Sequence, residues 1–393
     1  MDLKKEIKLS DLVRRPKKTR SPGTRAFPIT GSKRSRGLGL SRSKAREIVG
    51  LKIGASQLAA ARVATGQRPK LLQVAREPLA SGIVNAGEVR DVEALATSLD
   101  DFFTNYSLPR RTVRLGVATN RIGVRAFEMA GVDDDRQLAN AVRFRAHEAI
   151  AIPMDAAVLD YHVVSETVDA SGALNRRIVL AAAYRESIDR YVTACKEAGI
   201  HLIGIDLEAF ALLRAVTPPP IDGDPPKAAV IAVTVGHDRT TLAISDGVVC
   251  DFTRVLEWGG ANLTAAIERG LRVSSDDAEA LKHDLTFDDD AADDDQRTAA
   301  RDAVRRELQT LARELVASLQ FYQSQQDSLA IGDILVAGGT TRMPGLVEEL
   351  ERVTRVRVRR ADPLTRVDVG DGVDAGDELP SLAVAIGLGV EDE

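Results

Sequence analysis

The chain has 393 residues, of which 44% are hydrophobic but only 4% aromatic, so it is long enough for two or more domains with cores of small aliphatic side chains. No apolar run approaches the roughly 18 residues that a membrane-spanning helix needs, and charged residues among the first ten argue against a secretory signal. The two cysteines, Cys195 and Cys250, lack metal-ligand spacing. We expect two buried free thiols in a reducing cytoplasm, with one disulfide as the alternative.

Residues 1–46 are strongly basic. They contain fifteen Lys and Arg against Asp2, Glu6 and Asp11, a net charge of +12 in a chain whose total is −5. A segment so rich in charge, Ser, Gly and Pro predicts a disordered arm. One hypothesis for the role of this arm is docking on anionic lipid at the inner face of the cytoplasmic membrane. The alternative is that the arm is merely solvated, or that the start of the chain is mis-assigned. We expect no nucleic-acid binding, because aromatic residues for base stacking are not interleaved.

Strand-like and helical patterns alternate after the arm. The first predicted strand pair is joined by a tight turn at Gly54, and the second surrounds Asn120. The segments with strand patterns are residues 48–53, 57–63, 112–118, 123–129, 157–164 and 177–183. Those with helical spacing are residues 85–107, 133–150, which has acidic residues at its N-terminus, and 185–198, which Gly199 ends.

A proline-rich linker at 218–226, with five prolines in nine residues, precedes a second strand-turn-strand unit. The strands are residues 230–235 and 240–245, and Gly236 then corresponds to Gly54, which suggests an internal duplication. Residues 285–296 predict a solvated acidic loop, because the ligand spacing and turn glycine of a calcium site are missing. Residues 298–325 predict the longest helix, and its apolar stripe is core and not a coiled coil.

Three glycine turns follow predicted strands. A glycine at a strand end lets the backbone approach a nucleotide closely, and exposed N–H groups or a helix N-terminus hold phosphate. Together the turns predict a nucleotide cleft between two related halves, whereas any one alone is a common tight turn. Rossmann and P-loop signatures are absent. The turn residues are Gly54, Ala55, Ser56 and Gln57; Gly236, His237, Asp238, Arg239 and Thr240; and Gly338, Gly339, Thr340 and Arg342.

The turns resemble the two phosphate elements and the adenosine element of the superfamily that includes actin, heat-shock chaperones and sugar kinases. Further segments resemble the PilM family of type IV pilus assembly proteins, over about residues 47–390. Trp258-Gly259-Gly260 is shared with the cell-division protein FtsA, but FtsA ends in a membrane-binding helix and this chain stops at Glu393, which favours PilM. The segments that carry the PilM resemblance are 144–153, 158–161, 205–212, 318–325 and 380–388.

The resemblance implies an α/β, actin-like (RNase H-like) two-lobed fold with an inserted subdomain of the FtsA/PilM type. The corresponding division is 1–46 for the arm, 47–110 with 185–217 for the first-lobe core, 111–184 for the insertion and 218–227 for the linker. The second-lobe core is then 228–270 with 330–390, and 271–329 is its helical subdomain with the acidic loop.

The nucleotide that the resemblance implies is ATP, but its metal is doubtful. The family carries an aspartate before the glycine of each hairpin turn, whereas this chain has Lys52 and Thr234. Magnesium between phosphates needs carboxylates or waters that carboxylates hold, so we expect slow or absent hydrolysis, no catalytic residue and no metal site. Lys52 either acts as a cation for metal-poor nucleotide binding or is a salt-bridged lysine of a decayed site. Asp238 is interpreted as a turn residue.

Glu279 and Lys282 occupy a helix position that faces the ribose in relatives, and the alternative is an ordinary exposed i,i+3 pair. The implied function is a cytoplasmic scaffold of the type IV pilus inner-membrane platform, peripheral to the membrane. A groove between the insertion and its lobe would grip the cytoplasmic peptide of PilN. A PilB-type ATPase, the platform protein PilC and a second copy of the chain are further expected partners. The rival hypotheses are an active actin-fold ATPase or kinase and an FtsA-like filament former.

Overall fold

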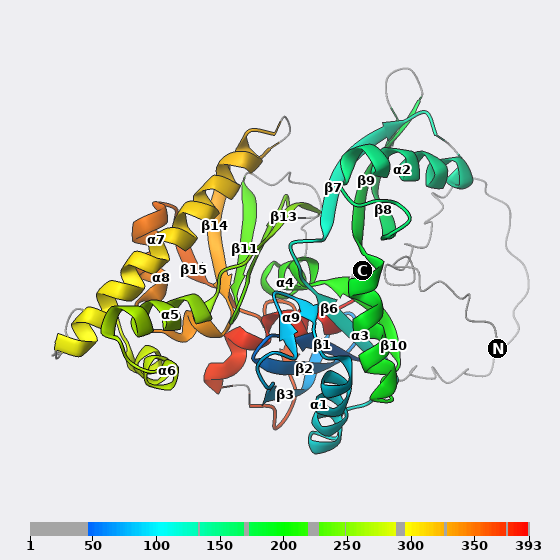
Figure 1. Ribbon diagram of the computed structural model, residues 1–393. Coiled ribbons are helices and arrows are strands. Elements are labelled where there is room, and N and C mark those ends of the chain that lie inside the picture. Colours follow the sequence, from blue (N-terminus) through cyan, green and yellow to red (C-terminus); the bar gives the residue numbers. More distant parts are fainter. Residues whose placement is uncertain are drawn as a thin grey trace, which may run out of the picture.

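The computed structural model describes residues 46–132, 134–168, 173–218, 228–247, 249–287, 295–325, 328–374 and 376–391 (Figure 1). The predictions for the basic arm up to residue 45, the linker at 219–227 and the acidic loop at 288–294 lie outside the described residues. Within the described part, no helix is both long and apolar enough to span a membrane. Cys195 and Cys250 are both free and buried, as predicted.

The first lobe is built on a six-stranded sheet of order β10-β6-β1-β2-β3-β16. β1 is almost entirely buried, as expected of a near-continuous apolar strand covered on both faces. The predicted first hairpin is confirmed, because β1 and β2 pair antiparallel around Gly54. The sheet comprises β1 (Glu47–Ile53), β2 (Gln57–Ala64), β3 (Lys70–Pro78), β6 (Val113–Val117), β10 (Leu202–Leu207) and β16 (Asp368–Val369).

The predicted strand pair around Asn120 is wrong. β6 does not pair with β7 (Gly123–Ala130); it lies between β1 and β10 and runs parallel to both. The apolar pattern of β6 suits either arrangement, and the sheet position is decided by contacts far away in the sequence. β6 therefore belongs to the six-stranded sheet, and β7 begins a separate one.

Two helices cover one face of the first sheet, α1 (Val92–Asn105) and α3 (Arg185–Glu197). α1 begins later than the predicted residue 85, because β4 (Val84–Asn85) and β5 (Glu88–Val89) form a short hairpin first. The hairpin turn has positive φ at Ala86 and Gly87, which a helix cannot accommodate. Asp91 then caps α1 by accepting a hydrogen bond from the Ala94 N–H.

A separate three-stranded sheet of order β7-β9-β8 stands at the upper right of Figure 1. It contains β7, β8 (Ala157–Val168) and β9 (Leu174–Tyr184), and α2 (Asp135–Ala149) packs on it. Asp134 caps α2 by accepting from the Arg136 N–H, so an acidic residue does begin this helix as predicted. The unit has its own core, to which Leu138, Val142 and Leu180 contribute.

The second lobe is built on a five-stranded sheet of order β13-β12-β11-β14-β15. The buried stripe of α7 confirms the predicted core face of the longest helix. The strands are β11 (Ala229–Val235), β12 (Thr240–Ser245), β13 (Cys250–Leu256), β14 (Ile331–Ala337) and β15 (Val358–Arg360). The helices are α5 (Gly260–Leu271), α6 (Ser275–Asp284), α7 (Asp295–Gln323) and α8 (Leu346–Thr354), with the short 3₁₀ helices η2 (Gly339–Arg342) and η3 (Gly376–Glu378).

The two large sheets repeat one topology. In each, the first two strands form an antiparallel hairpin, and a later strand pairs parallel on the other side of the first one. Gly54 N–H donates to the Gln57 carbonyl at 2.9 Å, and Gly236 N–H donates to the Arg239 carbonyl at 2.9 Å, so the two turns have the same closure. The internal duplication suggested by the sequence is thus present in the strand order. α4 (Glu208–Val216) and α9 (Leu379–Gly389) pack together between the two sheets.

Candidate functional site

The three glycine turns lie together where the lobes meet. Gly338 has a φ of +101°, and a Cβ at this position would lie 2.2 Å from the Val235 carbonyl oxygen. Thr340 Oγ1 donates a 3.1 Å hydrogen bond to the carbonyl of Gly236. Arg239 reaches across to the first lobe, where Nη2 donates to the Ile53 carbonyl at 3.2 Å. The second turn is therefore in contact with both of the others.

The turn before α5 packs against the second hairpin turn and forms hydrogen bonds with it. Gly260 N–H donates to the Gly236 carbonyl at 2.9 Å, and Ala261 N–H donates to the His237 carbonyl at 2.7 Å. Gly259 tolerates no side chain here, because a Cβ would lie 2.4 Å from the His237 carbonyl oxygen. The Trp258-Gly259-Gly260 motif thus positions the second turn against the N-terminus of α5.

Glu208 is the centre of a buried group of charges that spans both lobes. It is the first residue of α4 and is 1% exposed. One carboxylate oxygen, Oε2, lies 3.4 Å from Lys52 Nζ, and the other, Oε1, lies 3.4 Å from Arg239 Nη2. We did not predict Glu208 as a site residue. The available signal was an acidic residue directly after a strand, at the start of a helix.

The Arg239 guanidinium is the most deeply buried cation of this group, at 5% exposed. Burial by itself lowers the pKa of this guanidinium, but Glu208, Tyr191 and Asp238 together outweigh burial and the pKa is raised. Tyr191 lies close by and donates a 3.0 Å hydrogen bond to the Gly87 carbonyl, and burial raises its pKa. Arg239 is therefore charged at every physiological pH.

Asp238 does more than shape its turn. Its Oδ2 accepts a 2.7 Å hydrogen bond from the Ala86 N–H, in the β4–β5 turn of the first lobe. Its Oδ1 lies 3.6 Å from Arg239 Nη1. Asp238 and Arg239, adjacent in the chain, therefore both attach the second-lobe hairpin to the first lobe.

Lys282 and Glu279 form a second cluster beside the Gly260 turn. Lys282 Nζ lies 2.6 Å from each carboxylate oxygen of Glu279, 2.9 Å from Thr264 Oγ1 and 3.4 Å from the Gly260 carbonyl. Burial alone would raise the pKa of Glu279, but hydrogen bonds from Lys282 and Thr264 lower it. Lys282 is 9% exposed, so the pair is not the ordinary exposed one that was the alternative.

The remaining predicted site residues have different surroundings. His237 is exposed, Ala55, Ser56 and Gly339 are half-buried, and Thr234 is buried at the end of β11. Thr240 is committed elsewhere, because its hydroxyl donates to the Trp258 carbonyl at 2.8 Å. Arg342 pairs with Glu378 of η3, at the edge of the site. The structure brings the turn residues together but directs these two side chains away from the charged group.

The two hairpin turns offer few free carboxylate oxygens for a divalent metal ion. Magnesium requires a shell of oxygen ligands, yet the acidic positions of the two hairpins hold Lys52 and Thr234. The two nearby carboxylates, Glu208 and Asp238, each face the Arg239 guanidinium. In the part of the chain described, no three His, Cys, Asp or Glu side chains are grouped so that they could hold a metal ion.

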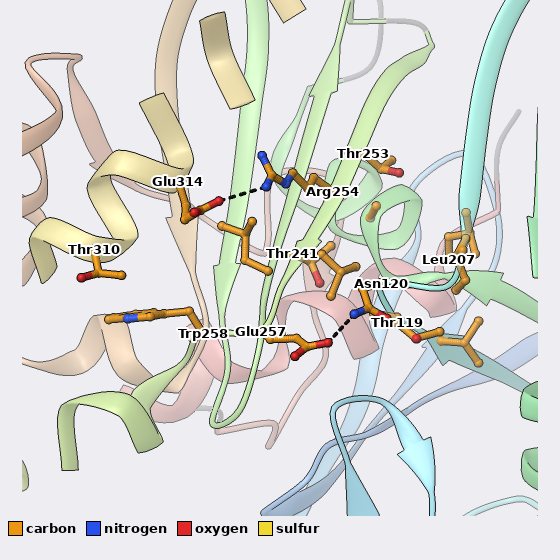
Figure 2. Close-up of a pocket in the computed structure, with 16 residues that line it drawn as sticks. Thr119, Asn120, Leu207, Thr241, Thr253, Arg254, Glu257, Trp258, Thr310 and Glu314 are labelled. Carbon is orange, nitrogen blue, oxygen red and sulfur yellow. Dashed lines mark hydrogen bonds and ion pairs between the residues drawn. The ribbon is translucent and has the colours of Figure 1, made fainter. Parts of the chain in front are cut away.

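A cavity of about 560 Å³ lies between the lobes (Figure 2). Residues 117–120 and 122 line one wall, and residues 253–258 with α7 line the other. Asn120 donates to Glu257 across this cavity, and Arg254 Nη2 pairs with Glu314 at 2.9 Å. Arg177 of β9 lies 2.8 Å from Asp246 and also pairs with Asp251, which ties the three-stranded sheet to the second lobe.

A second hollow of about 650 Å³ lies where α3 of the first lobe meets the base of the three-stranded sheet. Its walls come from α1, from α3 and from the base of the inserted unit at Ala156 and Tyr184. Arg185 crosses this boundary and donates to the Ala157 carbonyl at 3.0 Å. The exposed carboxylates in the hollow are those of Glu186 and Asp189.

Comparison with known proteins identifies the family. The family model described as "Type IV pilus assembly protein PilM" matches residues 50–393. Cell division protein FtsA of Bacillus subtilis is 23% identical in an alignment 314 positions long that covers 70% of this chain and 70% of that protein. In structure, the chain resembles a PilM–PilN type IV pilus biogenesis complex with a TM-score of 0.72 and 25% identity, over 88% of this chain and 98% of that one. MreB5 of Spiroplasma citri bound to AMPPNP has a TM-score of 0.51 and 11% identity, over 87% and 94%.

The likeness to MreB5 concerns the fold alone. That fold agrees with the two sheets of repeated topology and with the glycine turns between them. The two-lobed, actin-like α/β fold predicted from the sequence is confirmed. The chain belongs to the type IV pilus assembly protein PilM family.

Proposed function

We propose that this protein is a scaffold of the type IV pilus inner-membrane assembly platform and that it grips a short cytoplasmic peptide of a PilN-like membrane protein. The observation that carries the proposal is the family match over residues 50–393, together with the likeness to a PilM–PilN complex across almost the whole of that chain. We also propose that the unit formed by β7, β8, β9 and α2 is the inserted subdomain of the family.

The hollow between α3 and the inserted sheet is our candidate for the peptide groove. At about 650 Å³ it has room for several peptide side chains, and it lies between the insertion and its lobe. Its charged side chains include Arg185, Arg190, Glu186 and Asp189. Arg190 is fixed in place because Nη1 donates to the Val89 carbonyl at 3.2 Å. The Asp189 carboxylate is exposed and offers acceptors to a peptide amide or cation.

We propose that the cleft at the three turns binds ATP and hydrolyses it slowly or not at all. The support is the grouping of the turns with the cations Lys52, Arg239 and Lys282, and the replacement of both hairpin acids. Nucleotide occupancy would bias the relative position of the lobes. The pairs Arg177–Asp246 and Asn120–Glu257 join the insertion side to the second lobe, so a lobe movement would reach the peptide groove.

The proposal is tested with the full-length chain and a fluorescent peptide carrying the N-terminal cytoplasmic segment of the PilN-like protein encoded in the same genome. Anisotropy titration should give saturable binding. Asp189→Arg should weaken it by about tenfold or more, the range of a lost charge-assisted contact in an interface. Glu197→Arg, the same charge reversal on the same helix but outside the hollow, should leave binding unchanged.

Failure of the native chain to bind the peptide would contradict the scaffold proposal. Equal binding by Asp189→Arg and the native chain would show that the groove lies elsewhere. We propose a PilB-type ATPase, PilC and a second copy of the chain as further partners, and peripheral attachment to the inner membrane through the basic arm. Vesicle flotation of the chain with and without residues 1–45 tests that attachment.

A further inference from the structure

We propose that the cleft takes a nucleoside polyphosphate without a divalent metal ion, with the Lys52 ammonium and the Arg239 guanidinium serving as its counter-ions. The inference rests on the proposed function only in taking the cleft to be a nucleotide site. It concerns the charge that the chain itself provides there.

The buried group has a surplus of hydrogen-bond donors. Lys52 has three N–H donors, and its ion-pair partner within the described residues is Glu208 Oε2 at 3.4 Å. Arg239 Nη1 is buried and has no hydrogen-bond partner in the described part of the chain, although Asp238 Oδ1 lies 3.6 Å away. A buried donor that stays unpaired is unfavourable. The complement of such a group is a ligand rich in acceptors, as phosphate is.

The same group lacks what a metal ion needs. A divalent cation requires free oxygen lone pairs, whereas Glu208 already has a cation at each carboxylate oxygen. Asp238 is likewise occupied by the Ala86 N–H and by Arg239. A divalent ion here would also have to displace two cations from the carboxylates that they already neutralise, and both cations are shielded from water, with exposed fractions of 12% for the Lys52 side chain and 6% for that of Arg239.

The ligand is a nucleotide and not free phosphate because a second recognition element lies beside the turns. Glu279, whose side chain is 38% exposed, has a carboxylate fixed by Lys282 and Thr264 next to the Gly260 turn. A fixed, partly exposed carboxylate is a suitable acceptor for sugar hydroxyls. Thr340 and Gly260 connect this element to the Gly236 turn.

A metal-free polyphosphate is a poor substrate for transfer, because the charge on the departing phosphate is not neutralised by an ion and no carboxylate is free to orient the attacking water. The nucleotide then remains intact and acts as a bridge. One side meets Lys52 of the first lobe and the other meets the second-lobe turns. Its part in the scaffold is to hold the lobes together.

The experiment is calorimetric titration of the full-length chain with ATP, once in EDTA and once in excess Mg²⁺. We expect the affinity in EDTA to equal or exceed that in Mg²⁺. Lys52→Met should weaken binding in EDTA by about tenfold or more, the effect of losing a charge-assisted contact to phosphate. Lys70→Met, at an exposed lysine of the same sheet, should leave it unchanged.

A gain-of-function variant keeps the test independent of lost folding. Lys52→Asp combined with Thr234→Asp should make ATP binding require Mg²⁺, and circular dichroism should confirm that this variant is folded. Binding by the native chain only in Mg²⁺ would overturn the inference, as would binding of ATP in neither condition. Because the PilN-like peptide is titrated separately, a negative nucleotide result does not by itself refute the scaffold.

Discussion

The Asp238 carboxylate of the second lobe accepts a 2.7 Å hydrogen bond from the backbone N–H of Ala86 in the first lobe, 152 residues away in the chain. The next residue, Arg239, donates to the Ile53 carbonyl of the same lobe. Two consecutive side chains of one hairpin turn thus provide opposite charges to the facing lobe. Substitutions at Asp238, Arg177, Gly338 and Glu279, with matched controls, test what the contacts of these residues contribute to stability.

Asp238→Ala should destabilise the protein by about 1.5–3 kcal/mol, because it leaves the Ala86 N–H without its charged acceptor and removes a carboxylate beside Arg239. Urea unfolding measures this change. Asp238→Asn is the matched control, because its amide oxygen preserves the acceptor while the charge is lost, so its effect should be smaller. Equal midpoints for all three proteins would contradict the role of Asp238 in joining the lobes.

Arg177→Asp should loosen the inserted sheet from the second lobe, because it brings a third acid beside Asp246 and Asp251. Burial lowers the pKa of the native Arg177, but these two carboxylates outweigh it and the pKa is raised, which reflects their attraction. About a third of the side chain is exposed, so the loss should be about 1 kcal/mol. Thermal unfolding is the measurement.

The double variant Arg177→Asp with Asp251→Arg is the control for that ion pair. It restores opposite charges and should recover part of the lost stability, which a double-mutant cycle quantifies. Strictly additive effects of the two substitutions would show that Arg177 and Asp251 do not interact.

Gly338→Ala should destabilise the second lobe by about 1–3 kcal/mol, because the residue has positive φ and the new Cβ would collide with the Val235 carbonyl. Gly339→Ala is the matched control at the adjacent position. Nothing lies within 4 Å of a Cβ there, so its effect should stay within about 0.5 kcal/mol. Differential scanning calorimetry compares the two. A larger effect at Gly339 than at Gly338 would refute the close approach of the turns.

Glu279→Gln should reduce the acid sensitivity of the protein. The pKa of Glu279 is lower in the folded state than its ordinary value, because the hydrogen bonds from Lys282 and Thr264 outweigh burial. The stability that Glu279 contributes is therefore fully present above its unfolded-state pKa, about 4.3, and is lost as the pH falls through the lower folded value. Guanidinium unfolding at pH 7 and at pH 3 should show a native-to-variant difference that shrinks in acid. A native-to-variant difference in unfolding free energy that is larger at pH 3 than at pH 7 would contradict this prediction.

Much of the fold could be predicted from local patterns. The hairpin around Gly54, the second hairpin around Gly236 and the core face of α7 all agree with the structure, because hydrophobic periodicity and glycine turns act over a few residues. The strand at 113–117 shows the limit of such patterns. Its apolar residues predict a strand, but they do not say that it pairs with β1 and β10 instead of with its neighbour in sequence.

The charged group of the cleft could not have been derived from local patterns. Lys52 stands out in the sequence because it replaces an expected acid. Its partner Glu208 is 156 residues further along the chain, and Arg239, the second partner of Glu208, comes from the other lobe. The sequence also did not show whether Lys282 is exposed or buried, and in the structure it is buried. By itself, then, the sequence determined many of the helices and strands, the glycine turns and the family. Only the tertiary structure decided which charges meet, because ion pairing depends on burial and on distances between segments that only the complete fold brings together.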